Sequence, residues 1–203
     1  MDTIQKSSYT TLDMDELIWE RVHTVAPLVI VGTREKSGYD LAPKHMITPL
    51  GFGNYFGFVC TPRHNTYQNI KTTGEFTVSF PRPNQLVTTS LSASPRTKQI
   101  SKSEGIVEQL AIIRATTMDA PMIQDAYFLL ECELHKIVDG FDDYSLITGR
   151  VKAAHAHKDY LRVSEQDEQE QLGRFPLLAY IAPGRFATIN ETYNFPFPRD
   201  FKR

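Results

Sequence analysis

The stretch from residue 27 to residue 81 constrains the fold of this 203-residue chain more than any other part. It opens with a continuously apolar run, residues 26–33 (APLVIVGT), which predicts a central strand and not a half-exposed one. Gly38 can adopt the positive φ of a tight turn, and the chain then returns as a second strand. Pro43 is expected to end the regular pairing of that strand.

The rest of the chain continues this pattern of strands joined by turns. The sequence predicts further strands over 54–60, 75–80, 126–139, 145–157 and 177–181, and helices over 13–23, 65–72, 84–94 and 104–110. Residues 165–171 are expected to be a charged, solvated patch. This pattern favours a mainly β fold, an antiparallel barrel of Greek-key type with a few helices, over a doubly wound sheet. We expect one domain over 1–203, with a loose N-terminus (1–11) and an extended C-terminal arm (193–203).

The composition narrows the classes of function. A net charge of −2 gives no reason to expect a nucleic-acid surface, and no apolar run reaches the length of a membrane span. The N-terminus has no apolar segment of the kind that a secretory signal requires. Cys60 and Cys132 lie in apolar, strand-like stretches, where reduced core thiols are expected. The sequence therefore predicts a cytoplasmic protein that binds neither nucleic acid nor membrane.

The turn that precedes the helix at 65–72 has the parts of an anion site. Thr61 and Thr66 offer hydroxyl groups, Arg63 offers a guanidinium, and the first amides of a helix carry partial positive charge. A capped surface helix with an incidental arginine explains the same pattern. Both interpretations stay open at the level of the residues alone.

The loop from Lys44 to Thr48 could border a flat heteroaromatic ring. Met46 and Ile47 could supply apolar contacts to the faces of such a ring, and the Thr48 hydroxyl and loop amides could bond its edge. Core packing by Met46 and Ile47, with Lys44 in solvent, is the alternative.

Several motifs stand in a characteristic order along the chain. They are Gly38, DLAPKH (40–45), TYQNI (66–70), GEFTV (74–78), APMI (120–123), LEC (130–132), and the segments 149–155 and 176–186. The ordered set resembles the flavin reductase-like family, the FMN-binding split barrels, and covers about residues 25–190. The family's usual Ser-Phe-Phe-Asn after the proline is replaced here by His45-Met46-Ile47-Thr48.

The resemblance implies a homodimer with FMN near the subunit interface. It places Thr66 and Asn69 at the ribityl phosphate with Arg63 as the nearby cation. It also places residues 45–48 along the isoalloxazine edge, and Cys60 and Thr61 beneath the ribityl chain. Lys44, His45 and Arg185 are candidates for positive charge near the flavin.

The chemistry implied is that of an NAD(P)H-dependent flavin oxidoreductase. The flavin carries the hydride chemistry, so no catalytic side chain is required and none is assigned. Two alternatives stay open: a flavoredoxin-like electron carrier that is not an enzyme, and a split-barrel binding module that has lost FMN. A redox protein or a monooxygenase is a possible partner. His155 and His157 share a strand face near Asp159, but a polar strand face is the favoured interpretation and no metal is expected.

Overall fold

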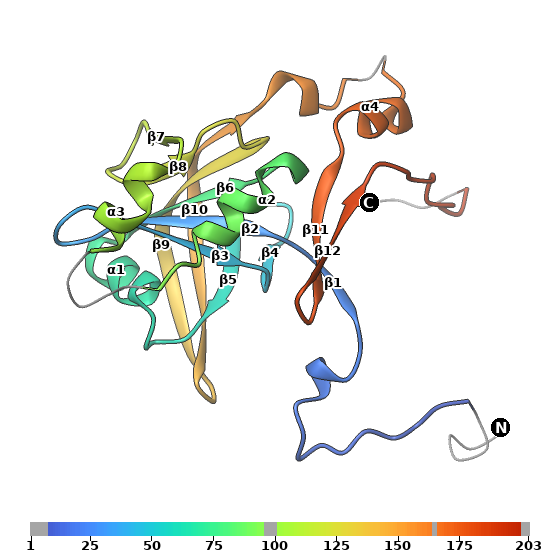
Figure 1. Ribbon diagram of the computed structural model, residues 1–203. Helices are drawn as coiled ribbons and strands as arrows, with labels where there is room; N and C mark the ends of the chain where they lie inside the picture. Colours follow the sequence, from blue (N-terminus) through green and yellow to red (C-terminus); the bar gives the residue numbers. More distant parts are fainter. Residues whose placement is uncertain (1–7, 96–100, 164–165, 200–203) are drawn as a thin grey trace.

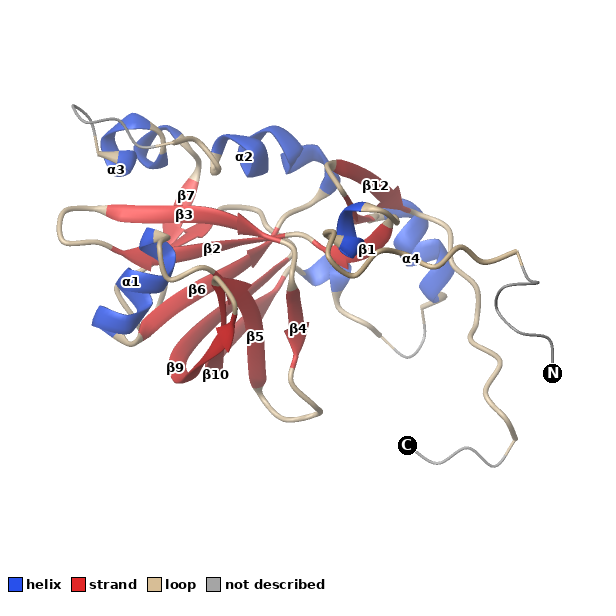
Figure 2. Cartoon of the chain, turned by 90° about the horizontal axis from the view of Figure 1, so that it is seen from below, coloured by secondary structure: helices blue, strands red, loops and turns tan. Residues whose placement is uncertain are grey.

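A curled antiparallel sheet of seven strands forms the body of the protein (Figure 1, Figure 2). The computed structural model describes residues 8–95, 101–163 and 166–199. The strands of the main sheet are β2 (Val29–Arg34), β3 (Tyr39–Lys44), β4 (Ile47–Pro49), β5 (Tyr55–Cys60), β6 (Glu75–Phe80), β9 (Phe128–Phe141) and β10 (Tyr144–Ala156). Their order in space is β3-β2-β6-β9-β10-β5-β4. The predicted mainly β, antiparallel class is confirmed.

Two smaller sheets flank the main one. The first has the order β1-β11-β12 and the second pairs β7 with β8. Their strands are β1 (Thr24–Pro27), β11 (Leu177–Ala182), β12 (Arg185–Ile189), β7 (Ile112–Arg114) and β8 (Pro121–Ile123). The run predicted as one strand over 26–33 is therefore divided at Leu28, because β1 pairs with β11 while β2 joins the main sheet.

Helices are few and short. They are α1 (Asn65–Thr73), α2 (Leu86–Leu91), α3 (Lys102–Gly105) and α4 (Glu168–Arg174), with 3₁₀ segments at Ile18–Glu20, Pro83–Gln85, Val107–Gln109 and Lys158–Tyr160. α1 carries the chain from β5 to β6, which β9 and β10 separate in the sheet. No helix among the described residues is long and apolar enough to cross a membrane.

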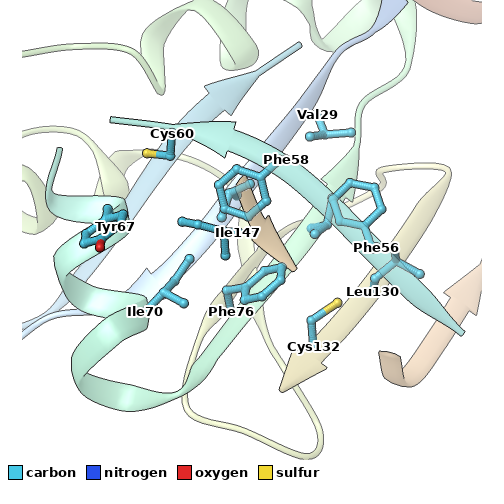
Figure 3. Packing of buried hydrophobic residues seen from close by; sticks show 12 residues of the cluster. Val29, Phe56, Phe58, Cys60, Tyr67, Ile70, Phe76, Leu130, Cys132 and Ile147 are labelled. Carbon is cyan, nitrogen blue, oxygen red and sulfur yellow. The ribbon is translucent and has the colours of Figure 1, made fainter. Parts of the chain in front are cut away.

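The apolar run of β2 is buried on both faces. Val29 and Val31 pack into the main hydrophobic cluster, which Figure 3 shows around Phe58 and Phe76. Ile30, which points to the other face, packs into a second cluster beneath β8 and the segment after α3. Two-sided burial explains why the sequence of β2 is continuously apolar and does not alternate.

α1 begins and ends close to where the sequence predicts. His64 is the N-cap residue with an extended backbone, and Gly74 ends the helix at φ 74°. The Gly74 amide donates a hydrogen bond to the Ile70 carbonyl at 2.8 Å, which satisfies one of the last carbonyls of the helix. One face of α1, with Tyr67 and Ile70, packs into the main cluster (Figure 3).

Two predictions about local structure are wrong. The helix expected over 13–23 is a short 3₁₀ turn at Ile18–Glu20, none of whose residues is buried: Trp19 is 65% exposed. Pro43 does not end β3, because β3 lies at the edge of the sheet, where a residue without an N–H is tolerated. The charged patch expected at 165–171 is exposed over residues 167–170 and forms the start of α4, whose N-cap Asp167 accepts a hydrogen bond from the Glu170 amide. Residue 165 lies outside the described residues.

The chain ends extend away from the main sheet (Figure 1). Tyr193, Phe195 and Phe197 are exposed by 86%, 70% and 47%, so the described part of the C-terminal arm does not bury its aromatic rings against its own chain. Residues 1–7 of the predicted loose N-terminus and 200–203 of the predicted arm lie outside the described residues.

Candidate functional site

A cavity of about 420 Å³ lies where the end of β3, the start of α1 and the first residue of α3 meet. α1 and α3 lie at the same end of the sheet in both views (Figure 1, Figure 2). The volume falls in the range of small-molecule sites. The lining residues are Asp40, Ala42, Pro43, Lys44, Arg63, His64, Asn65, Thr66, Ala93, Ser94, Pro95 and Lys102.

The start of α1 faces this cavity with His64, Asn65 and Thr66. The N-cap His64 makes no side-chain capping hydrogen bond, and no acidic residue occupies the first turn. The partial positive charge of the helix start is therefore not offset by a carboxylate from its own first turn. Such an arrangement favours an anionic ligand.

Positive side chains outnumber negative ones around the cavity. Lys44, Arg63 and Lys102 carry formal positive charges, and Asp40 is the one acidic residue among the described residues that line it. Burial and then Lys44 lower the pKa of His64, and Asp40 opposes this effect. The His64 imidazole is therefore neutral at pH 7, and the lining has a net positive charge.

Asp40 and Lys102 form a buried ion pair in the cavity wall. The Lys102 Nζ lies 3.1 Å from Asp40 Oδ1, and the two side chains are only 9% and 5% exposed. The same ammonium donates a hydrogen bond to the Leu41 carbonyl. On the other side, the Thr66 hydroxyl donates to Asp40 Oδ2 at 3.4 Å, which connects the ion pair to the start of α1.

A second cavity of about 260 Å³ adjoins the first one at Pro43. Its lining is mostly apolar and aromatic, with one cation and three hydroxyl groups. The residues are Leu28, Pro43, Leu86, Thr89, Ser90, Tyr180, Gly184, Arg185 and Phe186. The pair of cavities thus offers a cationic compartment beside an apolar one.

The structure brings part of the predicted site together. Lys44, Arg63 and Thr66 line the first cavity. Thr61 shapes its turn, because the Thr61 carbonyl accepts a hydrogen bond from the His64 amide at 3.0 Å and the Thr61 hydroxyl accepts one from the Arg63 amide at 3.4 Å. Arg185 lies in the second cavity.

Cys60 lies behind the first cavity. It is buried, and its Sγ is 4.0 Å from the Nδ1 of His64. Burial raises the pKa of the Cys60 thiol, although Lys44 opposes this, so the thiol is protonated at neutral pH. Its place is the wall beneath the helix start, and the protonated thiol is not a nucleophile there.

Asn69 lies apart from both cavities. Its side-chain amide donates to Thr33 Oγ1 at 2.9 Å and to Glu35 Oε1 at 3.3 Å. These bonds hold α1 against the hairpin between β2 and β3. Asn69 therefore supports the helix that presents the site.

None of the predicted residues from His45 to Thr48 lines either cavity. The His45 ring packs at a tilt against Tyr180, which lines the second cavity, with 4.4 Å between ring centroids, and burial and then Lys44 lower its pKa. The imidazole is therefore uncharged at pH 7. Ile47 packs against the main core, Met46 is 49% exposed, and the Thr48 hydroxyl bonds the Pro49 carbonyl.

The sequence did not indicate several residues of the first cavity. Asp40 lies inside the quoted motif at 40–45 and His64 lies in the turn before α1, but no distinctive spacing marks either of them as a lining residue. Lys102 lies some sixty positions after Asp40, so no local pattern could connect the two. Among the described residues, no group of three or more His, Cys, Asp or Glu side chains could hold a metal ion.

The fold and these cavities define a class of protein: a split barrel with a cationic cleft at a helix start and an apolar cleft beside it. A sequence model described as the flavin reductase like domain matches residues 22–181. The chain belongs to the flavin reductase-like family. No curated protein matches the sequence.

Solved structures share the fold at low sequence identity. The 2-nitrobenzoate 2-nitroreductase NbaA of Pseudomonas fluorescens is 20% identical, with a TM-score of 0.77 over 96% of this chain and 99% of that one. Flavoredoxin from Methanosarcina acetivorans is 17% identical, with a TM-score of 0.74 over 93% and 95%. An FMN-binding protein from Thermus thermophilus, with bound 1-cyclohex-2-enone, is 21% identical, with a TM-score of 0.72 over 93% and 99%.

Proposed function

We propose that this protein is an FMN-binding oxidoreductase that uses NAD(P)H as its electron donor. The observation that carries the proposal is the pair of adjoining cavities, one cationic at a helix start and one apolar, in a chain of the flavin reductase-like family. A flavin mononucleotide has the matching chemistry, since a dianionic phosphate and a flat apolar ring lie at its two ends. FMN, when bound, supplies the hydride chemistry.

The residues of each cavity fit one end of this cofactor. Lys44, Arg63 and the first amides of α1 are suited to hold the phosphate through charge-assisted hydrogen bonds. Pro43, Tyr180 and the other apolar residues of the second cavity are suited to cover the ring and to exclude water.

Arg185 supplies the positive charge proposed beside the ring. It is an exposed residue in the lining of the second cavity, and a guanidinium stays charged at any pH of interest. Positive charge at that position favours the reduced, anionic form of a flavin by Coulomb attraction. Because His45 is uncharged at pH 7 and Lys44 lines the first cavity, we assign this role to Arg185.

We also propose that the protein is a homodimer. The support is the exposed apolar surface near both chain ends, where Trp19, Phe195 and Phe197 are 65%, 70% and 47% exposed. Apolar surface of this kind is costly in water and is typical of contact with another chain. Light scattering during size-exclusion chromatography tests this proposal, and a monomeric mass would contradict it.

A spectroscopic titration tests the proposed activity. The purified protein is titrated with FMN and with FAD under anaerobic conditions, and NADH and then NADPH are added, with dithionite as the reference reductant. Bleaching of protein-bound FMN by a nicotinamide supports the proposal and identifies the donor.

Bound flavin that only dithionite reduces indicates an electron carrier that receives its electrons from a redox protein. A reductase whose reduced flavin passes to a monooxygenase would release FMN on reduction. A protein that binds no flavin contradicts the proposal.

A further inference from the structure

Lys102 reaches the first cavity from a distant part of the chain. It is the first residue of α3, and a capping box fixes its backbone: the Glu104 amide donates to Ser101 Oγ at 3.2 Å, and the Ser101 amide donates to Glu104 Oε2 at 3.1 Å. The side chain then extends into the wall that Asp40 shares. The position of the ammonium is therefore set by backbone and carboxylate together.

The hydrogen-bonding capacity of this ammonium exceeds what the cavity wall uses. An ammonium has three N–H donors. Within the described residues, it donates a hydrogen bond to the Leu41 carbonyl and forms an ion pair with Asp40 Oδ1, 3.1 Å away. Among these residues, at least one of its donors therefore has no acceptor and can serve a ligand in the cavity that Lys102 lines.

The Thr66 hydroxyl, in contrast to the Lys102 ammonium, has no hydrogen-bond donor left for a ligand. A hydroxyl group has one proton, and the Thr66 hydroxyl directs it to Asp40 Oδ2. The Thr66 hydroxyl is therefore committed to the carboxylate and has no proton to give to an anionic ligand. Its effect on a ligand passes through Asp40 and Lys102.

We propose that Lys102 is a phosphate-binding residue of this cavity, and that Asp40 and Thr66 are positioning residues that hold its ammonium at the wall. The ligand group is a phosphate monoester, the part of FMN that riboflavin lacks. This inference rests on the proposed function, because it takes FMN as the ligand. Burial strengthens the contribution of Lys102 relative to the exposed Arg63, since a charge removed from water is less screened.

The comparison of FMN with riboflavin isolates the phosphate. Dissociation constants for both flavins are measured by flavin fluorescence with wild-type protein and with Lys102→Met. We expect Lys102→Met to weaken FMN binding by about 10- to 100-fold, the range of a lost charge-assisted hydrogen bond. Riboflavin binding should change less than about twofold, because riboflavin makes no phosphate contact. Lys71→Met is the matched control, since Lys71 is an exposed lysine at the other end of α1, and both affinities should stay at the wild-type values.

A second variant covers the case in which Lys102→Met does not fold, because that substitution leaves the Asp40 carboxylate buried without its cation. The double variant Asp40→Asn/Lys102→Met removes both charges and should show the same selective loss of FMN affinity. Equal loss of FMN and riboflavin binding, or no loss of either, in a folded variant would overturn the assignment while leaving the proposed function in place. Wild-type protein that binds neither flavin would overturn both.

Discussion

Glu131 is the residue whose substitution gives the sharpest test of the electrostatics of this fold. It is fully buried on β9 and accepts hydrogen bonds from the amide and hydroxyl groups of Thr116, at 2.9 and 2.8 Å, and of Thr117, at 2.6 Å each. His155 on β10 places its Nε2 3.0 Å from Glu131 Oε1. Burial alone would raise the pKa of Glu131, but the bonds from Thr117 and Thr116 outweigh it and lower the pKa from 4.5 to about 2. The carboxylate thus fastens the turn between β7 and β8 to the main sheet.

The substitution Glu131→Gln keeps the shape of the side chain, removes its charge and turns one acceptor into a donor. Each pKa unit corresponds to about 1.36 kcal/mol, so a pKa lowered from 4.5 to about 2 corresponds to about 3 kcal/mol for the charge of Glu131 alone. The neighbouring His155 is 44% exposed, and allowing for solvent screening on that side we expect the loss of this charge to lower the free energy of unfolding by about 2 kcal/mol at pH 7. Because the folded pKa is below the unfolded one, this contribution is fully present above pH 4.5 and is lost as the pH falls towards 2.

Urea unfolding at a series of pH values measures this effect. Glu133→Gln is the control, because Glu133 lies two residues further along β9 and makes an exposed ion pair with Lys152 at 3.1 Å. An exposed pair contributes less than about 1 kcal/mol. We expect the gap between wild type and Glu131→Gln to narrow between pH 4.5 and 2 without closing, since the new amide still faces the Thr117 donors. A free energy of unfolding equal to that of the control, or a gap of constant size across this pH range, would refute the reasoning.

Three other predictions follow from the cavities and the backbone. Gly32→Ala should lower the free energy of unfolding by about 2 kcal/mol or more, because the new Cβ would lie 2.1 Å from the Pro121 carbonyl oxygen. Gly173→Ala should raise the free energy of unfolding by about 0.5 kcal/mol, because Gly173 lies in α4 and the nearest atom to the new Cβ is 3.9 Å away. Thermal unfolding of the two variants compares these effects. A bound phosphate raises the pKa of His64, so wild-type affinity for FMN should increase relative to that of His64→Gln as the pH falls from about 8 to 6, and a pH-independent ratio would contradict this. Asp143 forms an ion pair with Arg63, which lines the first cavity. Because Asp143→Asn removes this negative partner, FMN affinity should rise about two- to threefold at low ionic strength and not at high ionic strength.

The strands were predictable because their patterns are local. The strands β5, β6, β9 and β10 begin and end within about two residues of the predicted bounds, since alternating or continuous apolar residues report directly which faces are buried. β4 (Ile47–Pro49) was missed, because it falls in the stretch expected to be a loop and, among the described strands, pairs only with β5. The helix expected over 13–23 has the right spacing but no surface to cover, and spacing alone cannot show this. The edge position of β3, which admits Pro43, is likewise a property of the whole sheet.

Only the part of the candidate site that one continuous segment of the sequence forms could be predicted. The turn from Thr61 to Thr66 shapes the first cavity, because a strand end followed by a helix start is one continuous segment. Asn69 belongs to the same motif, yet its amide contacts the neighbouring hairpin, and one turn of helix separates it from the cavity-lining residues. Lys102 was not predictable at all, since its place depends on where β3 and α3 meet.

The presence of Asp40 in the otherwise cationic lining of the first cavity has a physical reason. Lys44, Arg63 and Lys102 surround one small volume, and three like charges with no counter-charge would destabilise the fold. Asp40 offsets the most buried of them, Lys102, so that the ammonium stays at the wall at a tolerable desolvation cost. The ion pair holds the Lys102 ammonium at the wall, and Lys44, together with Arg63, which also pairs with Asp143, adds positive charge to the lining. A carboxylate that looks unfavourable for anion binding is thus the group that keeps the most buried cation in place.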